Sequence, residues 1–90
     1  MYWLLLYELV DDYVERRAPL RDEHLGRARA AHERGELLLA GAVGEPIDSA
    51  VLVFQGDDDA AARAFAEADP YVTNGLVTGW HVKAWHVVVD

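Results

Sequence analysis

Four stretches of the chain are dominated by aliphatic and aromatic residues, and each is bounded by turn-forming residues, which is the pattern of β-strands. They are Tyr2 to Leu9, Leu37 to Ala42, Ala50 to Phe54 and Val77 to Val89. The first stretch ends at the Asp11-Asp12 turn signal. A segment containing Gly, Pro and Asp, Val43 to Ser49, separates the second stretch from the third. We therefore expect those two strands to form a hairpin with a long loop.

Two further stretches are predicted to be helical. After a polar connection over Asp11 to Ala18, the first helix begins at Pro19, whose missing N–H costs nothing in a first turn. It runs to Gly35, a residue suited to the left-handed position after a helix end. The second helix covers the alanine-rich segment Ala60 to Ala68. The acidic run Asp57 to Asp59 supplies a capping carboxylate and negative charge where the helix dipole favours it.

The second helix is expected to stop at the Asp69-Pro70 step, because proline disfavours helical geometry at the residue before it. A turn over Tyr71 to Gly75 then leads to the last strand. The resulting order is β-α-β-β-α-β, the ferredoxin-like arrangement of an α+β domain, in which two helices cover one face of an antiparallel sheet. A chain of 90 residues builds a single hydrophobic core, so we expect one domain over residues 1–90.

This arrangement leaves the second face of the sheet uncovered. A strand with one wet face alternates apolar and polar residues, yet Leu4-Leu5-Leu6 and Val51-Leu52-Val53-Phe54 are apolar on both sides. We infer that the second face is buried against another copy of the chain, which predicts a homodimer.

One histidine lies on the inward face of the first predicted helix. At about 100° per residue, His24 falls in the same arc as Ala28 and Ala31, with Arg21 beside it. One interpretation is a neutral imidazole that fills space and bonds to a backbone carbonyl. The other is an imidazole held by a carboxylate, which would fix its tautomer and suit it to proton transfer. Either requires a partner, since an unsatisfied buried polar group costs about 1–3 kcal/mol.

The candidate carboxylate for such a pair is Asp69. An Asp-Pro step at a helix end is also typical of a turn that faces water, so the residue alone leaves both interpretations open. In a β-α-β-β-α-β fold, however, both helices lie on the same face of the sheet. The end of the second helix can therefore approach the His24 segment of the first.

Composition narrows the function classes. The formal net charge is -8, from 16 acidic and 8 basic residues that are scattered along the chain, so we expect no nucleic-acid partner. No apolar run approaches the roughly 18 residues of a membrane span, and we expect no membrane-spanning segment.

The absence of cysteine excludes disulfides and zinc-thiolate sites, and the histidines lack His-Glu-x-x-His spacing, so we expect no metal and no cofactor. Without a signal-peptide pattern, we expect a cytoplasmic protein.

Ser49 is the only serine in the chain. It lacks the G-x-S-x-G setting of a nucleophile elbow. We therefore expect its hydroxyl to hydrogen-bond a ligand and not to act as a nucleophile.

Several short motifs in this order resemble the YCII-related family of small ferredoxin-like dimers. The motifs are Arg21-Asp22-Glu23-His24-Leu25, Gly35-Glu36-Leu37-Leu38-Leu39-Ala40-Gly41, Asp69-Pro70-Tyr71 and Gly75-Leu76. The resemblance runs nearly end to end. It implies an α+β barrel formed by two subunits, and an active-site His-Asp pair in a cleft, which falls on His24 and Asp69. One enzyme similar to the family removes chloride from a chlorinated hydroxyhydroquinone.

From these observations together we expect an enzyme that carries out elimination, isomerisation or related proton transfer on a cyclic or aromatic small molecule. His24 is the expected general base and acid, and Asp69 orients it and stabilises the imidazolium. Arg21 is expected to bind an anionic group or a developing oxyanion, and Ser49 and Tyr71 to contact the substrate. The alternative is a non-catalytic ligand-binding or structural dimer, in which the His-Asp pair only fixes packing.

Overall fold

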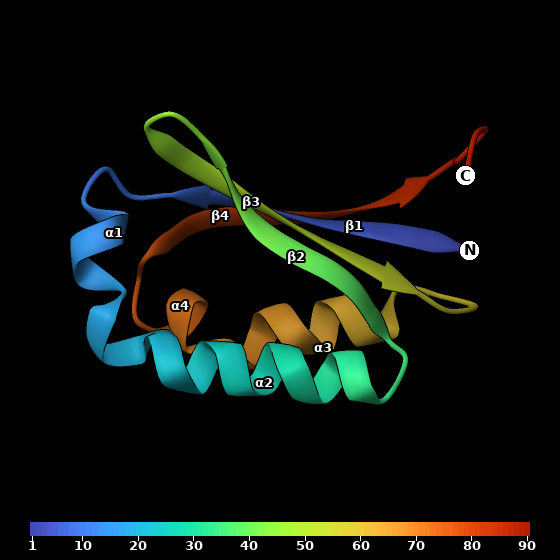
Figure 1. The fold of residues 1–90 in the computed structure, drawn as a ribbon, viewed down its shortest axis with the longest axis horizontal. Coiled ribbons are helices and arrows are strands. Elements are labelled where there is room, and N and C mark those ends of the chain that lie inside the picture. The colour runs from blue at the N-terminus through green and yellow to red at the C-terminus, as the bar shows by residue number, and fades with distance from the viewer.

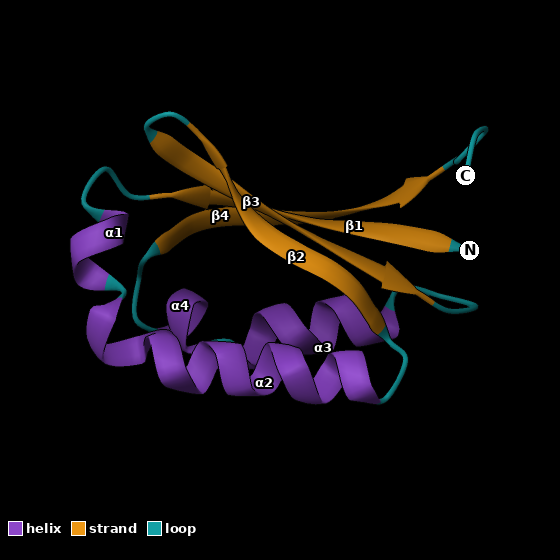
Figure 2. Ribbon diagram, viewed as in Figure 1, coloured by secondary structure: helices purple, strands orange, loops and turns teal.

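The computed structural model describes residues 1–90 as a four-stranded antiparallel sheet whose helices gather on one face (Figures 1 and 2). The strands are β1 (Tyr2–Leu9), β2 (Leu37–Gly44), β3 (Ile47–Gln55) and β4 (Val77–Trp85), in the sheet order β2-β3-β1-β4. The helices are α1 (Tyr13–Arg16), the 3₁₀ helix η1 (Ala18–Leu20), α2 (Arg21–Glu33), α3 (Ala60–Ala68) and α4 (Pro70–Thr73). The expected ferredoxin-like α+β arrangement is confirmed.

Several element ends agree with the sequence pattern. β1 and α3 have the expected bounds. Gly35 has a φ of 79°, the left-handed conformation that suits glycine after a helix. The first long helix begins differently, because Pro19 lies in η1 and the α-helical part starts at Arg21.

The long loop expected over Val43 to Ser49 is wrong. β2 continues to Gly44 and β3 begins at Ile47, so only Glu45-Pro46 joins them. The φ of Gly44 is 108°, and a Cβ there would lie 2.7 Å from the backbone oxygen of the nearby proline. Glycine therefore permits the tight turn. The strands extend into this Gly- and Asp-containing segment because its end of the hairpin is largely exposed and backbone pairing there needs no apolar alternation.

Two short helices occupy segments that the sequence pattern presents as irregular. α1 lies in the expected polar connection and buries Tyr13 against the core. α4 lies in the expected turn after Asp69, with Pro70 at its first position. The last strand ends at Trp85 and not at Val89, because β1 begins at Tyr2 and offers no pairing partner beyond that register position.

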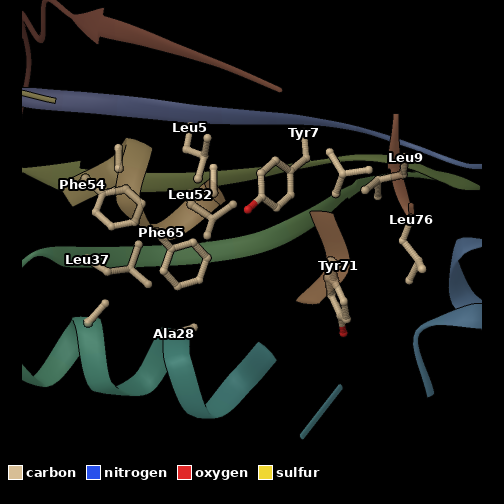
Figure 3. Close-up of a cluster of buried hydrophobic side chains, with 14 of the residues drawn as sticks. Leu5, Tyr7, Leu9, Ala28, Leu37, Leu52, Phe54, Phe65, Tyr71 and Leu76 are labelled. Atoms are coloured by element: carbon tan, nitrogen blue, oxygen red, sulfur yellow. The ribbon is translucent and has the colours of Figure 1, made fainter. Parts of the chain in front are cut away.

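The core lies between the sheet and the two long helices (Figure 3). Side chains alternate between the faces of a strand, so Leu5 and Tyr7 of β1 point toward the helices, and the register places Leu52 of β3 opposite Leu5. On the helix side, α2 buries Ala28 and α3 buries Phe65. The side chain of Tyr7 is thus enclosed by apolar neighbours, and its hydroxyl needs a hydrogen-bond partner within the protein.

The opposite face of the sheet carries no helix (Figure 1). Leu4 pairs with Val53 and Leu6 with Val51 on this outer face. At its margin the side chain of Leu39 is 67% exposed and that of Trp85 is 46% exposed. Apolar residues therefore occupy both faces of the central strands, as the sequence indicates. None of the helices has the length and hydropathy that a membrane crossing requires.

Candidate functional site

Asp69 is buried between the end of α3 and the start of α4, and none of its surface is exposed. Its backbone is extended, with ψ 124°, because the following residue is Pro70. The carboxylate caps α4 by accepting a hydrogen bond from the backbone N–H of Tyr71 at 3.0 Å. Local sequence thus fixes the carboxylate at a helix end, and the fold then brings two distant side chains to it.

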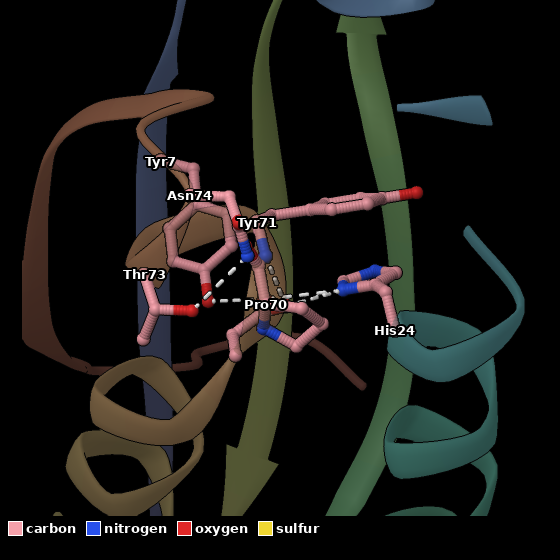
Figure 4. A network of polar contacts seen from close by, with 7 residues as sticks. Tyr7, His24, Pro70, Tyr71, Thr73 and Asn74 are labelled. Carbon is pink, nitrogen blue, oxygen red and sulfur yellow. Dashed lines mark hydrogen bonds and ion pairs between the residues drawn. The ribbon is translucent and has the colours of Figure 1, made fainter. Parts of the chain in front are cut away.

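The first of these side chains is His24 of α2, whose Nδ1 lies 2.9 Å from Oδ1 and 3.1 Å from Oδ2 of Asp69 (Figure 4). The imidazole stacks on the ring of Tyr71, with 3.9 Å between centroids and 10° between planes. Phe65 contacts it edge-on at 6.1 Å. Only 13% of the His24 side chain is exposed. These contacts fix the ring so that Nδ1 faces the carboxylate, which accepts its hydrogen bond, while Nε2 makes no hydrogen bond within the protein.

The second side chain is Tyr7 of β1, whose hydroxyl donates a 2.8 Å hydrogen bond to Oδ2 of Asp69. Burial raises the pKa of Tyr7 above its ordinary value, and the neighbouring carboxylate raises that pKa further. The phenol therefore stays protonated and remains a donor. The sequence pattern did not single out this residue, although strand alternation places its hydroxyl on the apolar face, where a buried phenol needs a partner.

A pocket of about 200 Å³ opens beside His24. Its walls come from the start of α2, from the inner face of the β2–β3 hairpin and from Tyr71. The expected site residue Arg21 lines it, and so do Tyr13 and Arg17, which the sequence pattern did not single out. The pocket is small, since sites for drug-sized ligands measure roughly 300–1,000 Å³.

Tyr71 contributes to the pocket as a neutral phenol. Burial raises its pKa to about 12, and the nearby Tyr13 adds to that rise, while Arg17 and Arg21 oppose it. The Tyr71 ring also packs edge-on against Tyr13 at 5.6 Å between centroids. Tyr71 is thus a wall of the pocket whose phenol stays protonated at neutral pH.

Comparison with known proteins identifies the family of this chain. The model of the YCII-related domain matches residues 1–86. The chain belongs to the YCII-related domain family. Two relatives, both named Protein YciI, come from Escherichia coli O6:H1 (strain CFT073) and Shigella flexneri. Each is 32% identical over an alignment of 87 positions, and the match covers 86% of this chain and 88% of the relative. The resemblance to the YCII-related family is confirmed.

Two solved structures share the fold of this YCII-related chain. The 5-chloro-2-hydroxyhydroquinone dehydrochlorinase TftG from Burkholderia phenoliruptrix AC1100, in complex with 2,5-dihydroxybenzoquinone, has a TM-score of 0.76 and 17% identity. That match covers 94% of this chain and 93% of the other. An antibiotic biosynthesis monooxygenase has a TM-score of 0.55 and 15% identity, and the match covers 99% and 100% of the two chains. At these identities the likeness shows the fold alone.

Ser49 does not lie with the other expected site residues of this YCII-related chain. It lies within β3, and its hydroxyl donates to Oδ1 of the neighbouring Asp48 at 3.0 Å. The next residue, Ala50, lines the pocket, so strand alternation turns Ser49 toward the outer face. Ser49 therefore does not line the pocket, contrary to expectation. The expectation placed Ser49 at the end of a loop, where its side chain could turn toward a ligand, whereas in β3 the side chain faces away from the pocket.

The remaining histidines of α2 and the sheet do not extend the site. The Nδ1 of His32 lies 2.8 Å from the backbone oxygen of Leu37, a contact that joins the end of α2 to β2. No group of three or more His, Cys, Asp or Glu side chains is arranged to hold a metal ion. The side chains that could exchange a proton with a ligand in this pocket therefore lie around Asp69 and His24.

Proposed function

We propose that this YCII-related protein is a small-molecule enzyme in which His24 acts as general base and general acid. The observation that carries the proposal is the 2.9 Å contact between Nδ1 of His24 and Oδ1 of Asp69, made by a ring that also lines the pocket. Nδ1 is committed to the carboxylate, so Nε2 is the nitrogen that exchanges protons with a ligand. A general base must reach its proton within hydrogen-bonding distance, and the pocket supplies that access.

Asp69 holds the imidazole in one tautomer and stabilises the imidazolium that forms during the reaction. Its other contacts, from the hydroxyl of Tyr7 and the backbone N–H of Tyr71, keep it from rotating away. Arg21 and Tyr71 bind the substrate, since both line the pocket. Arg21 offers a guanidinium to an anionic group or to an oxyanion that develops during the reaction.

The reaction class we propose is proton transfer at carbon on a cyclic or aromatic substrate. Nε2 of His24 removes a proton from a substrate C–H, and the electron pair of that bond either expels a leaving group or moves through the conjugated system. In the first case the proton passes to solvent and the reaction is an elimination. In the second case His24 returns the proton to another atom and the reaction is an isomerisation. The fold shared with a dehydrochlorinase supports this class.

We further propose that the functional unit is a homodimer formed through the outer face of the sheet. Leu4, Leu6 and Val51 lie at the centre of that face, are only partly buried within one chain, and have no helix over them. Monomeric proteins rarely expose large contiguous apolar patches. A second copy of the same face would bury these residues and give the two-subunit α+β barrel that the family resemblance implies.

A non-catalytic ligand-binding or structural dimer is the second candidate. The observation in its favour is that every buried side-chain N or O atom has a hydrogen-bond partner, as a polar group used only for packing requires. In that case the contacts among Tyr7, His24 and Asp69 serve packing alone.

A substrate screen separates the two candidates. Wild type and His24→Gln are incubated in D₂O with a panel of cyclic and aromatic compounds, and deuterium uptake or product is followed by ¹H NMR. The enzyme proposal expects turnover of at least one compound by wild type and loss of at least about 100-fold in His24→Gln, the lower range for general acid–base catalysis. Equal turnover by the two proteins would end the proposal. Unfolding of His24→Ala without turnover by wild type would favour the structural candidate.

A further inference from the structure

The pocket beside His24 is lined by basic and not by acidic side chains, although the protein as a whole is acidic. The chain carries a net charge of -8, yet the charged and titratable side chains that line the pocket are Arg17, Arg21, His24 and the tyrosines, with no Asp or Glu among the lining residues. Such a local reversal of sign concentrates ligands of the opposite charge. The charge distribution therefore favours an anion.

Neither arginine is neutralised by an ion pair. Among the arginines, Arg16, Arg34 and Arg63 contact carboxylates within 4 Å, while Arg17 and Arg21 contact none. The acidic residues that follow Arg21 along the chain are exposed and do not line the pocket. Both guanidinium groups therefore keep their donors for a ligand.

Aromatic contacts fix the place of this charge relative to His24. The guanidinium carbon of Arg17 lies 5.3 Å from the ring centroid of Tyr13. Tyr13 packs edge-on against Tyr71, and Tyr71 stacks on His24. Arg21 begins the helix that carries His24 one turn later. The two arginines and the imidazole thus line one pocket from neighbouring positions.

The rest of the lining is apolar and small. Ala28, Leu52 and Ala50 contribute aliphatic surface, and Ala40 and Gly41 of β2 leave room at the opposite wall. A space of about 200 Å³ accommodates a small organic body rather than a nucleotide or a peptide. An apolar wall with two guanidinium groups matches a carboxylate on a compact, ring-sized body, because guanidinium and carboxylate bind with paired, charge-assisted hydrogen bonds.

We propose that Arg17 and Arg21 form an anion subsite of the His24 pocket, and that the ligand is a small organic carboxylate whose apolar body lies against the β2–β3 wall. The subsite adds a substrate class to the proposed function. It rests on the proposed function only in that turnover of the bound ligand requires His24. Binding itself needs the two arginines and not the basicity of His24.

Benzoate, with the uncharged benzamide as its matched counterpart, tests the subsite. The ¹H–¹⁵N spectrum of labelled protein is titrated with each compound in low-salt buffer. Benzoate is expected to shift amide signals near Arg21 and Gly41, and benzamide to bind at least about tenfold more weakly, as expected for loss of one charge-assisted contact. Equal affinity for the two compounds, or no shift at the solubility limit of benzoate, would overturn the proposal.

Variants complete the test. Arg17→Gln and Arg21→Gln are each expected to weaken benzoate binding about tenfold, while Arg29→Gln, an exposed arginine outside the pocket, leaves it unchanged. Unchanged affinity in both subsite variants would overturn the proposal. His24→Gln should still bind benzoate. If the protein turns over a neutral compound through His24 but binds benzoate no better than benzamide, the subsite proposal fails and the proposed function stands.

Discussion

The hydroxyl of Tyr7 donates a 2.8 Å hydrogen bond to Asp69 Oδ2, joining the first strand to the end of α3 across 62 residues of sequence. Both side chains are buried. This contact, together with the capping bond from Tyr71, holds the carboxylate still while His24 bonds to it. The histidine is therefore supported by core packing, and the stability of the fold is coupled to the geometry of the site.

Tyr7→Phe removes the hydroxyl and leaves Oδ2 of Asp69 with fewer donors in a buried place. We expect the free energy of unfolding to fall by about 1–3 kcal/mol, the cost of an under-satisfied buried polar group. Urea denaturation followed by circular dichroism measures it. Tyr2→Phe, at a partly exposed position on the other face of β1, is the control and should change little. A loss no larger than that of the control would contradict the role of the bond.

The bond between His24 and Asp69 makes a prediction about proton position. Neutral His24 should carry its proton on Nδ1, and Asp69→Asn should move it toward Nε2, because the amide no longer offers two acceptor oxygens. Long-range ¹H–¹⁵N spectra of the imidazoles report the tautomer. His32, whose Nδ1 contacts the backbone oxygen of Leu37, is an internal control that should not change. A His24 tautomer that is the same in both proteins would refute this assignment.

Alkaline pH should destabilise the protein through Tyr7 and Tyr71. The pKa of each phenol is raised in the folded state, that of Tyr71 to about 12 from 10.0. Above pH 10 the unfolded chain therefore releases protons that the folded chain retains, so stability is full below pH 10 and declines as pH rises toward 12. Tyr71→Phe should flatten this decline in urea denaturation measured from pH 8 to 11. A decline as steep as in wild type would contradict the burial of this phenol.

The outer face of the sheet predicts the oligomeric state. Leu39→Lys places a charge at the margin of the face through which we propose that two copies associate, and should shift the mass in analytical ultracentrifugation from dimer toward monomer. Val88→Lys is the control, since its side chain is 93% exposed in the tail beyond β4. A wild-type mass of one chain at every concentration would refute the dimer.

The sequence predicted those features that depend on local periodicity. The helical arc of α2 places His24 on the inner side, and the order of elements follows from the apolar runs. The partner of His24 stayed open, because an Asp-Pro step fits a water-facing turn as well as a buried cap. Tyr7 and Asp69 are 62 residues apart in sequence, so only the packing of the helices on the sheet brings them together.

Ser49 shows the opposite case. Its neighbours Asp48 and Gly44 suggested a loop, and a loop would have left the hydroxyl free to meet a ligand. The hairpin instead stays paired to Gly44 and Ile47, which fixes Ser49 on the face away from the pocket. The mistaken strand start left the direction of the Ser49 side chain open, whereas within β3 successive side chains alternate between the two faces.

The central claim is that Nε2 of His24 exchanges protons with a ligand in the pocket. Its most direct test uses the compound that wild type turns over fastest in D₂O, and compares the rate of deuterium exchange at its reacting C–H in wild type, His24→Gln and the matched variant His32→Gln. Exchange is expected to be lost in a folded His24→Gln protein and retained in His32→Gln. Exchange at the wild-type rate in folded His24→Gln would contradict it.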